Sequence, residues 1–396
     1  MGGRMAGYIF LLDKSVSPLE VASKGVYSTR VPRPDGRLEG GKRRALNRWT
    51  SAAEGTLADY VSMRQGDHVF LFQNRKIYGV GRLVNAGRNC VFQNFPDASN
   101  PRTRLGSPNS GVLCKPIVAG EESGDYPWLC TFVMDPGLLT EPVDMDDALA
   151  SKPHAFRSLR VMEKVSFTKL DDEETRALLD VLARRNKSTG YTTIEEPSIH
   201  QYIDRTTDGR DDYNLNAKLV VDAAANPDGS LRHEMALEVA VVEHIASTNE
   251  ATSPIFGNWS FVTHQFSASP FKPVIYMDRI DVFGYARGQY QSITDFLVIE
   301  IKKGEAGDSE VAQLMKYVDW TAREFAGGDY SAIHAFLVAF DFDESLNGSL
   351  RRIAERGYTV GSRPAVSRVW TQTSLVRYHY DHADRQVKFS QHPISP

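Results

Sequence analysis

Residues 230–340 alternate between helix-like and strand-like hydrophobic patterns, and this alternation constrains the fold more than any other feature of the chain. The run LRHEMALEVAVVEHIAS predicts a helix, and the runs SFVTHQF, PVIYMDRIDVFGY and DFLVIEIKK predict strands, the last two joined by the polar turn ARGQYQS. A helix over DSEVAQLMKYVDWTAREF and a buried strand over AIHAFLVAF follow. The order of these elements predicts an α/β sandwich with a mixed central sheet.

Asp281 and the Glu-x-Lys triplet at residues 300–302 lie on the two strands of the predicted hairpin. Since side chains alternate along a strand, Glu300 and Lys302 share one face, while the neighbouring isoleucines point into the packed side. If Asp281 pairs across the hairpin, two carboxylates converge with no histidine or cysteine beside them, a ligand set suited to Mg²⁺ or Mn²⁺. Such an ion polarises phosphoryl oxygens and lowers the pKa of bound water, which Lys302 could orient or deprotonate. The pattern predicts phosphodiester hydrolysis.

The triplet is weak evidence by itself, because a chain of this length contains about one by chance. The alternative is an ordinary charge cluster between neighbouring strands on a solvated sheet face. The helix predicted after the triplet adds context, because its apolar stripe leaves a second face that could border the site. The stripe consists of Val311, Leu314, Met315, Val318 and Phe325, and the second face of Gln313, Lys316, Tyr317 and Trp320.

These residues resemble the PD-(D/E)xK nuclease superfamily, which has a restriction-endonuclease-like fold. The run RIDVFGY…DFLVIEIKKGEAGDSEVAQLMKYV is similar to the nuclease domains of EndoMS-type mismatch endonucleases and Shedu-type defence nucleases. In those domains a strand Asp, a Glu-x-Lys strand and a helix opening with Gln-Leu-x-x-Tyr recur. The resemblance implies that Asp281 and Glu300 are metal ligands, that Lys302 is the catalytic lysine, and that Gln313 supports them.

The resemblance covers roughly residues 230–340 and leaves one site residue open. The family's early helix usually supplies another acid, for which Glu238 is favoured here and Glu234 stays an alternative. The proline that names the superfamily is absent before Asp281, where Arg279 and Ile280 stand instead. Two further lysines near the triplet are expected to contact nucleic acid, namely Lys303 and Lys316.

The sequence pattern of the N-terminal block, residues 1–186, predicts a small β-barrel with helices. The run YIFLL predicts a strand, TLADYVSM a short helix, and HVFLF with IYGVGRLV a hairpin whose Gly79 and Gly81 permit close approach of backbone or ligand. The acid-led run DDEETRALLDVLARRN predicts a closing helix. Residues 187–229 are polar and turn-rich and predict a linker with local structure before the second domain, residues 230–396. The fold class expected for the whole chain is α+β.

The run MRQGDHVFLFQNRKIYGVGRLV resembles the PUA-like and EVE families of small barrels. Such barrels often hold a flipped-out or modified base in an aromatic pocket beside a basic rim, because an extruded base is held by stacking while phosphates need arginine or lysine. The alternative is that these aromatics fill the barrel core and the arginines are merely solvated. The candidates for the base pocket are Trp49, Phe72 and Tyr78, and those for the rim are Arg43, Arg44 and Arg48.

The charge distribution bears on nucleic-acid binding more than the net charge does. The formal net charge is −4, yet residues 1–50 carry ten Lys and Arg against four Asp and Glu, and residues 351–396 carry eight against three. Local basic surfaces are therefore expected at both ends. Three cysteines without a CxxC pair support neither a zinc site nor a disulfide framework, and no apolar run approaches bilayer length. A cytoplasmic location follows as an expectation.

Together these features predict a Mg²⁺-dependent or Mn²⁺-dependent endodeoxyribonuclease, in which an N-terminal reader of modified DNA is tethered to a C-terminal nuclease. Tethering raises the local concentration of cleavable backbone. The resemblance implies restriction of foreign DNA in antiviral defence, and a homodimer is expected. One alternative is a repair endonuclease acting on mismatched or branched DNA. Another is a nucleic-acid-binding reader that has lost catalysis.

Overall fold

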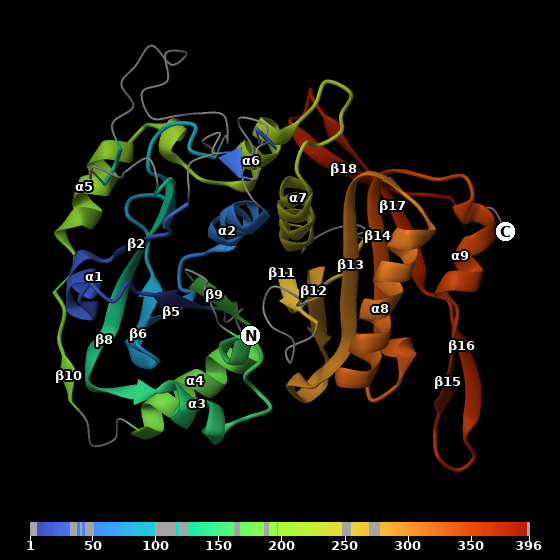
Figure 1. Ribbon diagram of the computed structural model, residues 1–396, viewed down its shortest axis with the longest axis horizontal. Coiled ribbons are helices and arrows are strands. Elements are labelled where there is room, and N and C mark those ends of the chain that lie inside the picture. The colour runs from blue at the N-terminus through green and yellow to red at the C-terminus, as the bar shows by residue number, and fades with distance from the viewer. Residues whose placement is uncertain are drawn as a thin grey trace. The chain divides into compact units, whose positions relative to one another are not determined.

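The structure is a computed structural model that divides into two compact units, Met1–Asn216 and Ala217–Pro396, called unit 1 and unit 2 (Figure 1). It describes residues 6–31, 38–39, 42–43, 51–99, 116–118, 126–161, 167–185, 190–195, 197–247, 255–268 and 278–393. Within these residues, no helix combines the length and the apolarity that crossing a bilayer requires. Both units combine helices with sheets that contain parallel and antiparallel pairs, which confirms the predicted α+β class.

Unit 1 is built on a mixed sheet that runs in the order β10-β8-β6-β5-β1-β9 within the described residues, with β2 and β7 also paired to β8. The β1–β5 pair is parallel. The strands of unit 1 are β1 Gly7–Leu11, β2 Val26–Ser28, β3 Leu38–Glu39, β4 Lys42–Arg43, β5 His68–Gln73, β6 Lys76–Leu83, β7 Val91–Gln93, β8 Trp128–Asp144, β9 Phe167–Leu170 and β10 Tyr191–Thr192. Of these, β3 and β4 pair only with each other in the described residues. Its helices are α1 Pro18–Lys24, α2 Ser51–Ser62, α3 Met145–Ser151, α4 Asp172–Arg185 and α5 Ser198–Thr207, with 3₁₀ turns η3 Leu159–Val161 and η4 Asp211–Tyr213.

The predicted hairpin of unit 1 is present as the antiparallel pair β5–β6. A Cβ atom on Gly81 would overlap the carbonyl oxygen of Val133, and one on Gly79 would lie 2.9 Å from the carbonyl oxygen of Gly137. The close approach that these glycines permit is therefore that of the β8 backbone. The described strands form a path with two ends, β10 and β9, so the predicted closed barrel is not confirmed.

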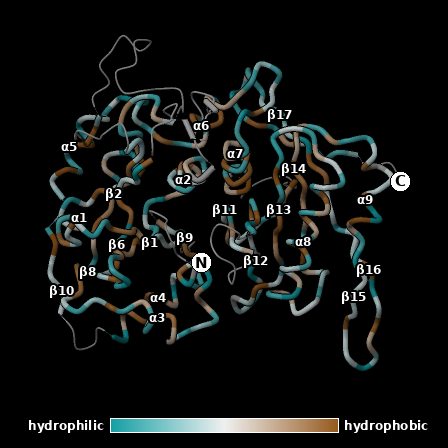
Figure 2. The backbone as a smooth tube through the Cα atoms, viewed as in Figure 1, coloured by the Kyte–Doolittle hydropathy of each residue, from teal (hydrophilic) through white to brown (hydrophobic). Residues whose placement is uncertain are grey.

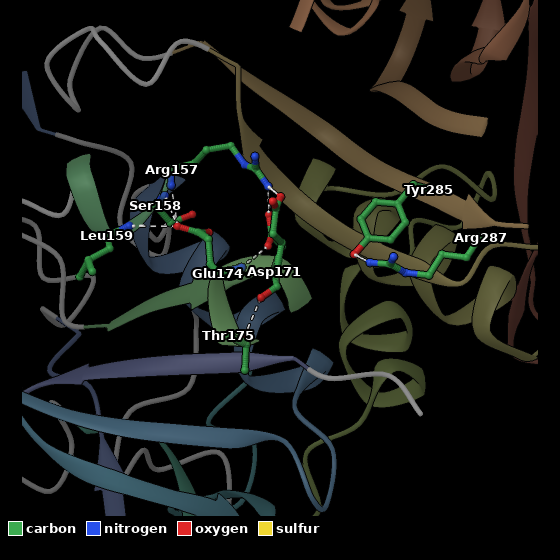
Figure 3. A network of polar contacts seen from close by, with 9 residues as sticks. Arg157, Ser158, Leu159, Asp171, Glu174, Thr175, Tyr285 and Arg287 are labelled. Carbon is green, nitrogen blue, oxygen red and sulfur yellow. Dashed lines mark hydrogen bonds and ion pairs between the residues drawn. The ribbon is translucent and has the colours of Figure 1, made fainter. Parts of the chain in front are cut away.

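A buried polar network fixes the start of α4 (Figure 3). Oδ1 of Asp171 accepts the backbone N–H of Glu174 at 2.8 Å, and Oε1 of Glu174 accepts those of Arg157 and Ser158, both at 2.7 Å. The Arg157 guanidinium in turn pairs with Asp171 at 2.7 Å. Because Glu174 has no exposed surface, its carboxylate ties the turn at residues 157–159 to the helix from inside the unit.

Unit 1 is expected to lose stability as the pH rises and Glu174, in this network, loses its proton. Burial, reinforced by the charge of Asp171, raises the pKa of Glu174 to about 7. An acid whose folded-state pKa exceeds its unfolded value stabilises the fold below the unfolded pKa, and that contribution, roughly 3 kcal/mol, is lost between about pH 4.5 and 7. Glu174→Gln should therefore match the parent protein at pH 5 and exceed its melting temperature at pH 8.

Scanning calorimetry at the two pH values measures this difference. Asp180→Asn, on the same helix but with its side chain 57% exposed, is the matched control and should keep the parent pH dependence. A Glu174→Gln variant that loses as much stability between pH 5 and pH 8 as the parent protein would contradict the expected role of Glu174.

Unit 2 is built on a second mixed sheet, called the main sheet, with the order β11-β12-β13-β14-β17-β18 in the described residues. Its β13–β14 and β14–β17 pairs are parallel and the others antiparallel. The strands of unit 2 are β11 Phe261–Ser267, β12 Arg279–Arg287, β13 Ile293–Ala306, β14 Ile333–Phe342, β15 Arg356–Val360, β16 Val366–Trp370, β17 Thr373–Asp381 and β18 Gln386–Gln391. Its helices are α6 Ala217–Ala224, α7 Glu234–Ser247, α8 Asp308–Glu324 and α9 Leu346–Ala354, with 3₁₀ turns η6 Gln289–Gln291 and η7 Tyr330–Ala332.

The order α7, β11, β12, β13, α8, β14 confirms the predicted order of elements. Both α7 and α8 pack on β13, on different sides of it in Figure 1. The face of β13 that carries Glu300 is packed as well, because Phe296 and Val298 on that face belong to the hydrophobic core that α8 covers. The predicted stripe of α8 lies in or against that core: Val311, Leu314, Met315, Val318 and Phe325.

The segment predicted as a linker, residues 187–229, is shared between the two units. In unit 1, α5 buries Ile203 completely, and its His200 ring lies 2.8 Å from the carbonyl oxygen of Gly25. In unit 2, α6 is held by a 2.6 Å hydrogen bond from the Tyr380 hydroxyl to Asp222. Much of this polar segment therefore belongs to one unit or the other, because it forms short helices that bury their apolar side chains.

Candidate active site

The main sheet brings Asp281 and Glu300 together. The β12–β13 register pairs Val282 with Ile299, and its continuation by one residue places Asp281 opposite Glu300, where neighbouring side chains lie on the same face. Oδ2 of Asp281 accepts the backbone N–H of Ile301 at 2.8 Å. Nζ of Lys302 donates to Oε1 of Glu300 at 2.8 Å. The three residues singled out from the sequence therefore form one cluster.

The cluster is more deeply buried than charged residues on a protein surface are. The Glu300 side chain is 0% exposed and that of Lys302 is 23% exposed. The alternative of a charge cluster on a solvated sheet face is at odds with these values, because Glu300 has no access to water in the described structure. A buried carboxylate is unfavourable unless a cation or several donors compensate it.

The acids of the cluster bind protons more tightly than isolated acids do. Burial raises the pKa of Glu300 to about 7, although the charge of Lys302 opposes the shift. Burial also raises the pKa of Asp281 well above its ordinary value, and the charges of Glu300 and Glu238 add to the effect. Burial alone would lower the pKa of Lys302, but the charge and hydrogen bond of Glu300 outweigh it and raise that pKa. The raised pKa favours the charged form of Lys302, which donates a hydrogen bond to Glu300.

Gln265, which the sequence did not single out, bridges two acids of the site. It lies on β11 between His264 and Phe266, which pair with the residues on either side of Asp281. Its Nε2 donates to Oδ1 of Asp281 at 3.3 Å and to Oε1 of Glu238 at 2.8 Å. Its φ of +52° is in the left-handed region, which is uncommon for a residue with a side chain. The signal that could have found it is the pairing of β11 with β12, because the two neighbours of Gln265 pair with the two neighbours of Asp281.

Both candidate acids of α7 belong to the cluster's surroundings. Glu238 shares the Gln265 amide with Asp281, and its Oε2 lies 3.4 Å from Nδ1 of His264. Glu234, one turn earlier on the helix, raises the pKa of Glu300 through its charge, after the larger effect of burial. Glu238 is thus linked to the aspartate end of the cluster and Glu234 influences the lysine end.

On α8, Tyr317 responds to the charges of the cluster. Burial raises the pKa of Tyr317 to about 12, and the charges of Glu300 and Asp281 contribute to the shift. Nε2 of Gln313 donates to the Tyr317 hydroxyl at 3.4 Å, which places Gln313 one turn away along the helix. Trp320 instead packs against the hydrophobic core, and Lys316 is exposed.

The remaining basic and aromatic candidates do not gather into a described site. Nζ of Lys303 donates to the carbonyl oxygen of Arg232 at 3.0 Å, so its ammonium holds the segment before α7. Phe72 is 7% exposed and packs in the core of unit 1, which gives it no free ring face for a base, while Tyr78 is partly buried on β6. The other candidates lie outside the described residues or, for Arg43 on β4, have no described side chain: Arg43, Arg44, Arg48 and Trp49.

The donor set fits a hard divalent cation held by two carboxylates. Oε2 of Glu300 and Oε2 of Glu238 are buried and accept no hydrogen bond in the described residues, so each retains lone pairs for a ligand. In the described part of the chain, no three His, Cys, Asp or Glu side chains are arranged as a ready-made metal centre. Mg²⁺ commonly binds through one or two carboxylates and keeps several waters, so Asp281 and Glu300 would suffice to hold it.

No protein-family model and no curated protein sequence matches the chain. Solved structures match part of it, including the following two. A repair endonuclease from Pyrococcus abyssi is 23% identical over 30% of this chain and 42% of that chain, with a TM-score of 0.19. EndoMS in complex with double-stranded DNA is 23% identical over 29% of this chain and 40% of that chain, also with a TM-score of 0.19. The chain thus covers less than half the length of either structure, and TM-scores this low do not establish a common fold.

Proposed function

We propose that this chain is a metal-dependent endodeoxyribonuclease whose active site consists of Asp281, Glu300 and Lys302. The observation that carries the proposal is the pair of adjacent carboxylates beside one lysine, of which Glu300 is fully buried and Asp281 partly buried. Acids with raised pKa values that are held together in a protein interior are characteristic of functional sites, because such an arrangement destabilises the fold.

Each residue has a role that its contacts support. Asp281 and Glu300 would hold Mg²⁺ or Mn²⁺, which when bound polarises the scissile phosphate and lowers the pKa of a water molecule. Lys302, as a cation, would donate to the phosphate or to the attacking water and offset the negative charge that develops. Gln265, which also bonds Glu238, would hold Asp281 in position, and Gln313 would fix the Tyr317 hydroxyl on α8.

The finer biological proposal is restriction of foreign DNA that carries modified bases, with unit 1 as the reader, in a cytoplasmic homodimer. Its support is the resemblance of the β5–β6 hairpin sequence to PUA-like and EVE barrels and the division of the chain into two compact units. Tethering a reader to a weak nuclease gives selectivity through local concentration. The second candidate is repair of mismatched or branched DNA, supported by the resemblance of residues 230–340 to EndoMS-type domains.

Incubation of the purified full chain with modified, unmodified and mismatched DNA tests these proposals, each substrate with Mg²⁺, with Mn²⁺ and with EDTA. Cutting of modified DNA alone, abolished by EDTA, is the expected result. Preferential cutting of the mismatched duplex would favour repair. Binding without cutting under every condition would contradict the nuclease proposal and favour a non-catalytic reader.

Gln265→Leu is expected to destabilise the metal-free protein and to be partly rescued by Mg²⁺. The substitution keeps the approximate size of the side chain but removes the hydrogen-bond donor that Asp281 and Glu238 share. Leaving a buried acceptor without a hydrogen bond lowers the free energy of unfolding by about 1–3 kcal/mol. Thermal unfolding in EDTA and in Mg²⁺ measures both effects. Gln201→Leu, at an exposed position of α5, is the control. An equal loss of stability with and without Mg²⁺ would show that Gln265 does not serve the metal-binding acids.

A further inference from the structure

The hairpin β15–β16 is an appendage of unit 2 that the proposed active site leaves unexplained. Its two strands pair with each other and, within the described residues, with no other strand. Figure 1 shows the hairpin extending beyond the main sheet, and Figure 2 shows hydrophobic and hydrophilic residues interspersed along it. Two of its apolar side chains are strongly exposed, Val366 at 48% and Val369 at 60%.

The base of the hairpin is firmly attached to unit 2. Trp370 is 2% exposed, and its Nε1 donates to the carbonyl oxygen of Ile333 at 3.1 Å. Nε and Nη2 of Arg356 donate to the two carboxylate oxygens of Asp319 on α8 at 2.8 and 3.2 Å. The ring of Tyr358 lies 5.9 Å from that of Tyr330. An isolated two-stranded hairpin is marginally stable in water, so these contacts explain how the exposed part keeps its shape.

The outer part of the hairpin is basic. From Gly357 to Trp370 the chain contains two arginines, Arg363 and Arg368, and no acidic residue. Both arginines are exposed, and neither forms an ion pair with a described residue. By contrast, Arg356 at the base is neutralised by Asp319. The unpaired positive charge of this appendage accounts for part of the basic excess of residues 351–396.

A polyanion complements this surface better than a protein does. Free arginines bind phosphates, and a two-stranded antiparallel ribbon has the width that the major groove of duplex DNA admits. Exposed valines beside the arginines can contact the apolar parts of bases and sugars. An exposed ribbon with unpaired edges is otherwise prone to aggregation, which a bound duplex would prevent.

The hairpin lies within reach of a duplex engaged at the carboxylate cluster. Glu300 pairs with Leu337, whereas the anchor of the hairpin, Ile333, is the first residue of β14. Four residues along a strand span about 13 Å, and the five-residue strands of the hairpin add about 16 Å. The sum is shorter than one turn of B-DNA, about 34 Å.

We propose that the β15–β16 hairpin is a DNA-contacting arm that grips the duplex less than one helical turn from the cleavage position. The location of the cut rests on the proposed function, whereas binding by the arm does not. The arm would supply two phosphate contacts through Arg363 and Arg368 and would favour duplex over single-stranded DNA.

The test is the affinity of the full chain for duplex DNA, measured by fluorescence anisotropy in EDTA over a range of salt concentrations. Arg363→Gln/Arg368→Gln should weaken binding at low salt by about tenfold or more and reduce the slope of log K against log salt by about 1.8, as expected for two lost phosphate contacts. The matched control is Arg351→Gln/Arg352→Gln on α9, which removes the same charge from arginines 3.1 and 3.8 Å from acids. The control should change binding less than twofold.

Three results would overturn the proposal. One is unchanged duplex affinity in the hairpin variant with its melting temperature preserved. Another is an equal loss in the α9 control, which would assign the effect to net charge. The third is a loss confined to single-stranded DNA. Since no metal is present, a failure of the nuclease proposal appears only as absent cleavage by the parent protein and leaves this binding result interpretable.

Discussion

Lys302→Ala should reduce DNA cleavage by about 10³-fold or more while leaving DNA affinity within about twofold. The variant removes the ammonium that donates to Glu300 at 2.8 Å, and with it the cation that would stabilise charge in the transition state. Binding draws on many phosphate contacts, so the loss of one lysine from a largely buried site has little effect on it. Single-turnover cleavage and anisotropy measured on the same protein preparation separate the two quantities.

The control for this variant is Lys218→Ala, an exposed lysine on α6 that contacts no residue of the cluster. It should cleave at the parent rate. Melting temperatures exclude unfolding as the cause of lost cleavage. Cleavage by Lys302→Ala at a rate near that of the parent protein would contradict the role assigned to Lys302, even if cleavage depends on metal.

Glu300→Gln should abolish both cleavage and the stabilisation of the protein by Mg²⁺. An ion that binds the folded state alone raises the free energy of unfolding, by about 2.7 kcal/mol at a concentration 100 times its dissociation constant. The substitution also leaves Lys302 without its anionic partner, so the metal-free variant should be less stable than the parent protein, and the Mg²⁺ response of each protein is compared with its own value in EDTA. The thermal shift with increasing Mg²⁺ measures the binding, and an assay on the same samples measures cleavage.

Glu324→Gln, at the exposed end of α8, is the matched control and should keep the parent response to Mg²⁺. A Glu300→Gln variant that Mg²⁺ stabilises as strongly as the parent protein would show that the ion binds elsewhere. A variant that unfolds in EDTA would instead show that the charge of Glu300 is structural.

The spacing of apolar residues along the sequence predicted the strands and helices that carry Asp281, Glu300 and Lys302. The alternation of DFLVIEIKK places Glu300 and Lys302 on one face, and the stripe of α8 confirms which side of that helix packs inward. Local patterns were sufficient here because strand and helix periods depend on neighbouring residues.

Other features depend on contacts between distant residues, which a single sequence does not specify. Gln265 joins the site only because β11 pairs with β12 in one register and because its backbone adopts a positive φ. The burial of Glu300 depends on the helices that pack on β13, which the strand pattern alone does not show. Phe72 lies in a core of unit 1 that residues from several other elements complete, among them Ile77 and Phe156, which its strand pattern does not show.

We expect Asp281 and Glu300 to hold one divalent ion between them. A crystal of the full chain soaked in Mn²⁺ and measured for anomalous scattering can locate this ion. A peak about 2.1 Å from a carboxylate oxygen of each residue is the expected result. A crystal in which Mn²⁺ binds only at other positions, from a preparation that cleaves DNA with Mn²⁺, would contradict it.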